Sequence, residues 1–133
     1  MTVWMTLALA LAACGGTDEP GAEAILVTWE TVVDGATYVT LIDDPEDITT
    51  IEAALEADGR AGIPNGRLQP GDGGVNLGHD WHVVEVELAD MAIEVCDGTV
   101  SYLDDLGYDA FVSEHGDRFC PWDARVVAVA PAE

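Results

Sequence analysis

Two β-rich runs of alternating character open the patterned part of the chain. Residues 24–29 (AILVTW) and 36–42 (ATYVTLI) are rich in β-branched and aromatic side chains, which favour strands. The Asp34-Gly35 pair between them is a turn signal. The pattern therefore predicts a β-hairpin formed by these two runs.

A helical pattern follows the predicted hairpin. Asp43-Asp44-Pro45-Glu46-Asp47 is typical of a helix start, with acids in the first turn and proline near the first helical position. Gly59 is a plausible stop. The apolar positions between them recur at helical spacing and give one face, made of Ile48, Ile51, Ala54 and Leu55.

Glycine and proline dominate the next segment, residues 61–78, which carries Pro64 and Pro70. This composition predicts a long loop with at most a short strand at residues 66–68. Long structureless loops in compact domains are often functional. The segment is therefore a candidate contact surface, and a plain surface excursion is the alternative.

The apolar and polar alternation returns at residues 81–88 and again at residues 91–96. Two interpretations stay open for this stretch. It forms either two strands of a hairpin turning near residues 89–90, or one long strand with a bulge.

The last part of the chain predicts one more helix and one more strand. Thr99 or Ser101 would cap a short helix through Tyr102, Leu103 and Leu106. Residues 125–129 (RVVAV) predict a final strand. Together the elements predict a single α+β domain over residues 24–133. We expect a mostly antiparallel sheet of about five strands, with one long and one short helix.

The N-terminus has the pattern of an export signal. Residues 1–13 contain a short apolar run, too short to span a bilayer. Leu11-Ala12-Ala13-Cys14 has the form of a bacterial lipobox, and residues 14–23 have the composition of a flexible tether. No Lys or Arg precedes the run, which leaves open a start upstream of Met1. The sequence predicts lipidation at Cys14 and an extracytoplasmic, membrane-anchored lipoprotein of a bacterial cell envelope. A buried apolar segment is the alternative.

Three cysteines are present, Cys14, Cys96 and Cys120. If Cys14 is lipidated, Cys96 and Cys120 are the one pair left in an oxidising compartment. Glu94 and Asp97 flank Cys96 and would disfavour a thiolate there, which argues against a nucleophile. Neither cysteine has a second cysteine at zinc-site spacing. We expect a disulfide, with a metal site and free thiols as alternatives.

The charge is strongly negative, with 26 Asp plus Glu against 4 Lys plus Arg and a formal net charge of −22. This balance argues against nucleic acid as a partner. It suits divalent cations or basic partners, and a solvated surface that keeps the protein soluble is the alternative.

Several short blocks resemble one known family. They are Tyr38 to Ile48, Asn65-Gly66-Arg67-Leu68, Trp81-His82, Ala92 to Asp97 (AIEVCD) and Cys120-Pro121-Trp122. Together they resemble the N-terminal domain of the slime-mould-type calmodulin-binding proteins, which also occurs in uncharacterised secreted bacterial proteins. The resemblance covers about residues 25–129, supports the Cys96–Cys120 disulfide and implies no enzymatic activity. Gln69 stands where a basic residue is expected.

Calmodulin binding does not carry over with the resemblance. A calmodulin target needs a basic amphipathic helix, and this chain is acidic throughout. Calmodulin is itself acidic, so the two proteins would repel each other. We therefore expect calmodulin not to be a partner.

Candidate binding residues lie around the predicted loop. Trp81 and Trp122 are expected as core aromatics near the disulfide, or else as a binding patch. Glu94 would pair with Arg67 or Arg125, act with His82 in a pocket, or lie exposed. The candidate set is Arg67, Trp81, His82, Glu94 and Trp122.

No metal site is predicted. His79 and His82 have an HxxH spacing, with His115 further on, but positions three apart in a strand face opposite sides. The acids Asp43-Asp44, Asp104-Asp105 and Asp109 lack EF-hand spacing.

The favoured function is a lipid-anchored, non-catalytic binding module for an unknown protein or small ligand, with no cofactor. The chain contains no Walker, G-x-S-x-G, H-E-x-x-H or dinucleotide motif. One alternative is an acidic calcium- or cation-binding envelope protein. The other is a small hydrolase or metal enzyme that uses His82 and Glu94.

Overall fold

The computed structural model describes residues 23–90 and 98–132, and within these ranges the chain is α+β with six strands and three helices. The strands are β1 (Ile25–Thr31), β2 (Ala36–Ile42), β3 (Ile63–Pro70), β4 (Trp81–Ala89), β5 (Arg118–Phe119) and β6 (Ala124–Pro131), and the helices are α1 (Pro45–Leu55), α2 (Val100–Leu106) and α3 (Tyr108–His115).

The first sheet has the strand order β2-β1-β6 and is antiparallel throughout. β1 and β2 form the predicted hairpin, in a register that pairs Ile25 with Ile42 and Thr31 with Ala36. The turn closes where the Gly35 amide donates to the Thr31 carbonyl at 2.8 Å. Gly35 adopts a positive φ of 69°, which glycine tolerates without a steric penalty. The hairpin prediction is confirmed.

The helix α1 begins and ends close to the predicted residues. The Asp44 carboxylate caps it by accepting from the Asp47 amide at 3.0 Å, and Pro45 is the first helical residue. After the last turn, the Gly59 amide donates to the Ala54 carbonyl at 2.8 Å. Of the predicted apolar face, Ile48, Ile51 and Ala54 are buried, whereas Leu55 is exposed.

The prediction of a loop over residues 61–78 is wrong for its first half, where β3 runs for eight residues. Proline is tolerated here for a geometric reason. The Leu68 amide donates away from β4, to Asp117 next to β5. Strand alternation turns the main chain of Pro64 to that same side, where β5 pairs with Gly66 and Arg67 alone. The missing N–H of Pro64 therefore breaks no ladder bond.

The second sheet has the order β4-β3-β5 and is also antiparallel. β4 confirms the strand predicted over residues 81–88. Its register against β3 shifts between Asn65 and Arg67, so β4 contains a bulge. Residues 91–97 lie outside the described part of the chain, so the choice between a hairpin and one long strand stays untested.

Two short helices precede β5, although the sequence patterns predict one. The Thr99 hydroxyl caps α2 by accepting from the Tyr102 amide, which confirms the predicted helix and its cap. The prediction of a polar loop after α2 is wrong, because α3 occupies Tyr108–His115. Only Phe111 of α3 is fully buried, so a two-turn helix with one core residue gives little periodic signal.

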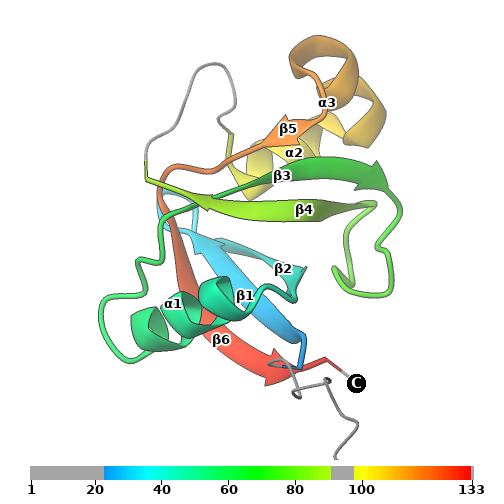
Figure 1. Ribbon diagram of the computed structural model, residues 1–133. Helices are drawn as coiled ribbons and strands as arrows, with labels where there is room; N and C mark the ends of the chain where they lie inside the picture. Colours follow the sequence, from blue (N-terminus) through cyan, green and yellow to red (C-terminus); the bar gives the residue numbers. More distant parts are fainter. Residues whose placement is uncertain (1–22, 91–97, 133) are drawn as a thin grey trace, which may run out of the picture.

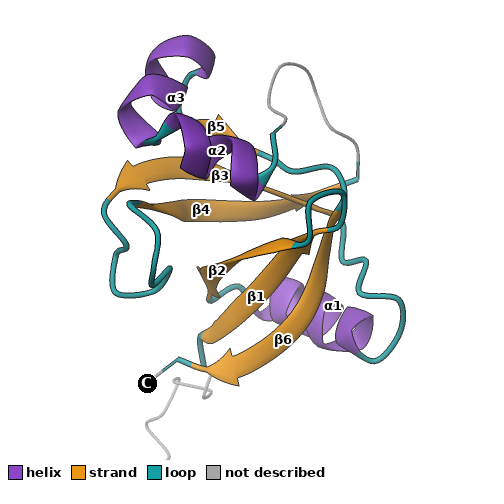
Figure 2. Ribbon diagram, turned by 180° about the vertical axis from the view of Figure 1, so that it is seen from behind, coloured by secondary structure: helices purple, strands orange, loops and turns teal. Residues whose placement is uncertain are grey.

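The prediction of one sheet of about five strands is also wrong, because the described strands form two sheets that share one core (Figure 1). α1 contacts β6 of the first sheet, whereas α2 contacts β2 and α3 contacts β3 (Figure 2). The largest fully buried side chains come from both sheets and α3: Trp29, Trp81, Tyr38, Phe111 and Phe119. The rings of Tyr38, Trp81 and Phe119 pack against one another at centroid distances of 5.4 to 5.7 Å.

The described helices have seven to eleven residues, and none combines the length and apolar character that a membrane-spanning helix needs.

Candidate functional site

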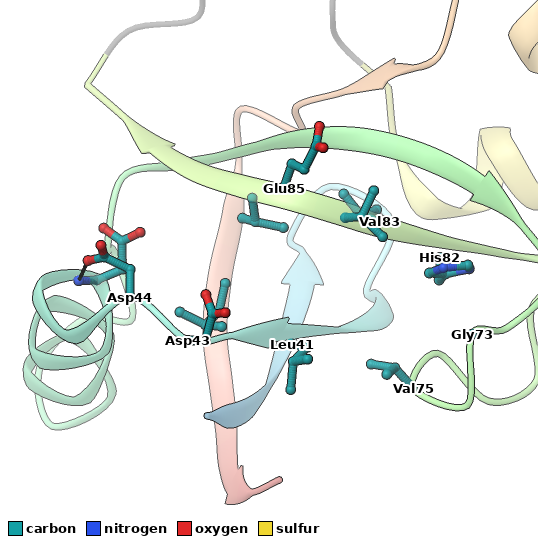
Figure 3. Close-up of a pocket in the computed structure, with 12 residues that line it drawn as sticks. Leu41, Asp43, Asp44, Gly73, Val75, His82, Val83 and Glu85 are labelled. Carbon is teal, nitrogen blue, oxygen red and sulfur yellow. Dashed lines mark hydrogen bonds between the residues drawn. The ribbon is translucent and has the colours of Figure 1, made fainter. Parts of the chain in front are cut away.

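A cleft of about 420 Å³ lies between the two sheets (Figure 3). β2 is an edge strand of the first sheet and β4 is an edge strand of the second. The two edges contact each other but share no ladder of main-chain hydrogen bonds. The cleft runs along both edges, from the loop of residues 71–80 at one end to the start of α1 at the other.

Asn76 closes the loop end of the cleft. Its side chain is 1% exposed and bridges the two sheets. The amide oxygen accepts from the Val39 main-chain N–H of β2 at 2.9 Å, and the amide nitrogen donates to the Trp81 carbonyl of β4 at 3.0 Å. Buried main-chain groups at two strand edges are thus satisfied by one side chain.

His79 fixes the same loop to β2 and α2. Its Nδ1 lies 2.8 Å from the Asp104 carboxylate, and its Nε2 lies 3.2 Å from the Thr37 carbonyl. Asp104 also accepts from the indole N–H of Trp81 at 2.7 Å. The loop of residues 71–80 is therefore held at two points on the outer edge of β2.

Apolar side chains form the walls of the cleft. Val83, at 7% exposure, is a buried part of the wall, whereas Leu41 is 47% exposed at the mouth. The remaining apolar lining consists of Ile42, Val75, Val84 and Val86. A ligand with an apolar body would remove this surface from water.

Carboxylates surround the end of the cleft near α1. Asp43, Asp44 and Asp47 line it there. The pKa of Asp47 is raised above its usual value by burial and by the neighbouring charges of Asp44, Glu46 and Glu87. A positive charge placed at this end would relieve that repulsion.

His82 forms part of the opposite end, under the loop. Its Nδ1 lies 2.8 Å from the Gly71 carbonyl. A Cβ at Gly73 would lie 2.6 Å from the His82 ring, so only glycine allows the loop to approach this closely. Figure 3 shows His82 beside Gly73 and Val75, on the side of the cleft away from Asp43 and Asp44.

Glu85 occupies the bulge of β4 in a conformation that is unusual for its residue type. It has a φ of 55°, a region that non-glycine residues enter at a steric cost. Its carboxylate lies 3.1 Å from the Arg67 guanidinium across the strands. Bulges often occur next to functional sites, where they redirect side chains.

The predicted site residues are only partly brought together. His82 lines the cleft, and Arg67 pairs with Glu85 beside it. Trp81 is fully buried in the core, so its indole is not a surface group. Glu94 lies outside the described residues, as do Cys14 and Cys96. Cys120 is buried at 1% exposure, and its predicted pairing with Cys96 stays a prediction.

Trp122 lies away from the cleft, in a second and more open hollow of about 450 Å³. The side chain is 60% exposed, and its neighbours Val33 and Tyr102 are 75% and 45% exposed. Because these groups stand out from the surface, the hollow offers a ligand less enclosure than the cleft between the sheets.

The sequence patterns do not single out the residues that shape the cleft. Asn76 lies in a glycine-rich stretch with nothing to mark it as buried, and Leu41 resembles any other apolar residue of a strand. Their importance comes from the pairing of two edges that only the fold brings together.

Metal ligands do not gather in the part of the chain that the structure describes. Over residues 23–90 and 98–132, no group of three or more His, Cys, Asp or Glu side chains is arranged to hold an ion. His79 and His82 instead contact different partners, Asp104 and the Gly71 carbonyl.

Comparison with known proteins identifies the family of the chain. No curated protein and no solved structure matches it significantly. The family model of a calmodulin-binding-protein-like N-terminal domain matches residues 22–133, which is most of the chain. This match confirms the resemblance at the level of the domain family. The chain therefore belongs to the family of calmodulin-binding-protein-like N-terminal domains.

Proposed function

We propose that this protein is a non-catalytic binding module of the cell envelope whose ligand enters the cleft between β2 and β4. One observation carries the proposal. An apolar cleft of about 420 Å³ lies between two strand edges and ends at three aspartates. Enclosed apolar pockets with a few convergent polar groups are the usual form of ligand sites.

The lining indicates the class of ligand. The walls favour an apolar, elongated body, and the aspartates near α1 favour a cationic group. The net charge of −22 adds a long-range attraction for cations and repels anions. The ligand class that fits best is therefore an elongated molecule with an apolar part and a positive charge.

The proposed address depends on the N-terminal sequence. The lipobox at residues 11–14 supports lipidation of Cys14, an anchor in the membrane and an extracytoplasmic location. Residues 14–23 would act as the tether that keeps the domain clear of the bilayer.

The disulfide between Cys96 and Cys120 belongs to the same proposal. A Cβ at Gly98 would lie 3.4 Å from the ring of Phe119, the neighbour of Cys120. Cys96 precedes Gly98 by two residues, a span of at most about 7 Å. This proximity supports the pairing, because bridged cysteines need Cα atoms within about 7 Å.

Two alternatives have weaker support. A calcium-binding role is favoured by the repulsion that raises the pKa of Asp47, but the described residues do not assemble three ligands. An enzyme using His82 and Glu94 would need a carboxylate at His82. Within the described part of the chain, Nδ1 of His82 instead contacts the Gly71 carbonyl.

The proposal is tested by calorimetry with three probes of one chain length: octylammonium, octanol and octanoate. We expect octylammonium to bind more tightly than octanol, and octanoate to bind least. Two matched variants locate the site. Leu41→Trp fills the mouth of the cleft, whereas Leu77→Trp adds the same ring to an exposed loop residue outside the cleft lining.

We expect Leu41→Trp to weaken octylammonium binding by about tenfold or more and Leu77→Trp to leave it unchanged. Octanoate binding as tightly as octylammonium would reject the ligand class. No heat from any of the three probes at millimolar concentration would reject the cleft as a ligand site. A titration with Ca²⁺ in the same buffer tests the calcium alternative, which predicts binding that Asp44→Ser weakens.

A further inference from the structure

The outer edge of β2 is covered along half of its length. Residues of an antiparallel edge strand alternately turn their main-chain groups to the neighbouring strand and to the free edge. The Val39 N–H and the Thr37 carbonyl point to the free edge of β2, because they bond to Asn76 and His79 of the loop. The loop of residues 71–80 therefore occupies the position that another strand would take.

The second half of this edge lies beyond the loop. By the same alternation, Leu41 turns its N–H and carbonyl to the free edge, and Asp43 is the next position in this series. Both residues line the cleft. Leu41 is 47% exposed and apolar, which is the opposite of the charged or bulged edges that discourage strand pairing.

The facing edge of β4 is less suited to accept a strand. Its bulge at Glu85 breaks the regular alternation, and bulges twist an edge away from further pairing. Its first half is already satisfied, since the Trp81 carbonyl accepts from Asn76. An additional strand would therefore pair with β2 and rest its side chains against the wall formed by β4.

The charge around this edge defines the sequence of such a strand. Asp43, Asp44 and Asp47 lie where the free part of β2 ends. Lysine or arginine side chains of a guest strand would reach these carboxylates, while its apolar side chains would face Val83 and Val86. An acidic guest would be repelled by the whole molecule.

We propose that the ligand of the cleft is a basic, extended peptide segment that adds to the free edge of β2 as a fourth strand of the first sheet, hydrogen-bonded to Leu41. This inference rests on the proposed function and names its ligand. Main-chain hydrogen bonds supply sequence-independent affinity in this mode of recognition, and alternate side chains supply specificity.

The probe is an eight-residue peptide of alternating lysine and valine, blocked at both ends. Its control is the same peptide N-methylated at every residue, which keeps each side chain and charge but donates no main-chain hydrogen bond. We expect the first peptide to bind at least tenfold more tightly than the control. We also expect it to slow hydrogen exchange at the Leu41 amide.

Two variants at one position test the main-chain bond itself. Leu41→Pro removes the outward N–H without removing a bond to β1, a change that edge strands tolerate. Leu41→Thr removes the same side chain but keeps the N–H. We expect Leu41→Pro to weaken peptide binding about tenfold more than Leu41→Thr. Hydrogen exchange in the unmodified protein gives the answer independently if Leu41→Pro does not fold.

The outcomes separate this inference from the proposed function. Equal binding of the two peptides, or no slowing of exchange at Leu41, overturns strand addition. If octylammonium still binds in a manner that Leu41→Trp weakens, the cleft remains a site for small cationic ligands. If neither peptide nor octylammonium binds, both proposals fail.

Discussion

At the residue scale, Asn76 connects the two halves of the molecule. It is fully buried, and its amide satisfies one main-chain group on the edge of each sheet. A side chain that both donates and accepts is needed, because the two strand groups are an N–H and a carbonyl. Asn76 therefore fixes the closed end of the cleft.

Replacing Asn76 with alanine should lower the free energy of unfolding by about 2 kcal/mol, since two buried main-chain groups lose their partners. Urea unfolding measures this change. Asn65→Ala is the matched control, because the buried Oδ1 of Asn65 has no hydrogen-bond partner in the described structure. Equal losses in the two variants would contradict the bridging role of Asn76.

Asp34 is the second residue with a joining role, in the turn between β1 and β2. It accepts from the Thr31 hydroxyl and from the amides of Ala36 and Ser101. Burial acts to raise the pKa of Asp34, but these hydrogen bonds outweigh it and lower the pKa from 3.8 to about 2. The charged carboxylate therefore fastens the hairpin turn to α2.

The lowered pKa predicts a dependence of stability on pH. The stabilisation from Asp34 is present above 3.8 and is lost as the pH falls toward about 2. Asp34→Asn should be less stable than the parent protein at neutral pH, and its stability should fall less steeply over this range. Thermal unfolding at a series of pH values tests this. The control Asp105→Asn, at an exposed position of α2, should keep the steeper fall.

At the element scale, the bulge of β4 shapes one wall of the cleft. It places Glu85 at a φ of 55° and offsets the register with β3. The strand before the bulge presents Val83 to the cleft, and Glu85 points away toward Arg67 (Figure 3). The bulge thus separates the apolar wall from the exposed ion pair.

Glycine should suit the bulge better than glutamate. Glu85→Gly relieves the strain of a positive φ, worth about 1 kcal/mol, at the cost of an exposed ion pair worth less than that. Glu87→Gly, two residues on in ordinary strand conformation, should lose about 1 kcal/mol. Chemical unfolding of both variants should show Glu85→Gly as the more stable. The reverse order would mean that the bulge is not strained.

Several elements could be predicted from the sequence, and the failures have physical causes. The β1–β2 hairpin, α1 and α2 carry local signals in Asp34-Gly35, Asp44-Pro45 and Thr99. β3 was missed because of prolines that are harmless only where β5 is short. The split into two sheets depends on which edges stay unpaired, and that is a property of long-range contacts rather than of local pattern.

The candidate site was predictable to a smaller extent. His82 was correctly placed beside a glycine-rich loop, since the loop's glycines allow its close approach. Trp81 belongs to the core instead, because alternation in β4 turns it inward between Tyr38 and Phe119. The acidic end of the cleft was visible only as a helix start.

At the scale of the whole molecule, two sheets share a core but leave one pair of edges open to a ligand. The net charge of −22 makes basic ligands the natural partners of that opening. The proposed anchor at Cys14 would hold the domain at the membrane surface, where it could meet ligands from outside the cell.

The anchor gives a prediction for the whole molecule. Cys14→Ser should move the protein from the membrane fraction to the soluble fraction, because the thiol that carries the lipid is gone. Fractionation followed by immunoblotting measures the distribution. Cys120→Ser should leave the protein in the membrane fraction. A Cys14→Ser protein that stays with the membrane would contradict the anchor.

The most direct test of the central claim is a map of main-chain amide chemical shifts, recorded by NMR on nitrogen-labelled Cys14→Ser protein during titration with octylammonium. The account predicts that the largest changes fall on the cleft lining, at Leu41, Asp44 and Val83, and that Val33 and Tyr102 change little. Changes concentrated around Trp122, or spread evenly over the surface, would contradict a ligand site between β2 and β4.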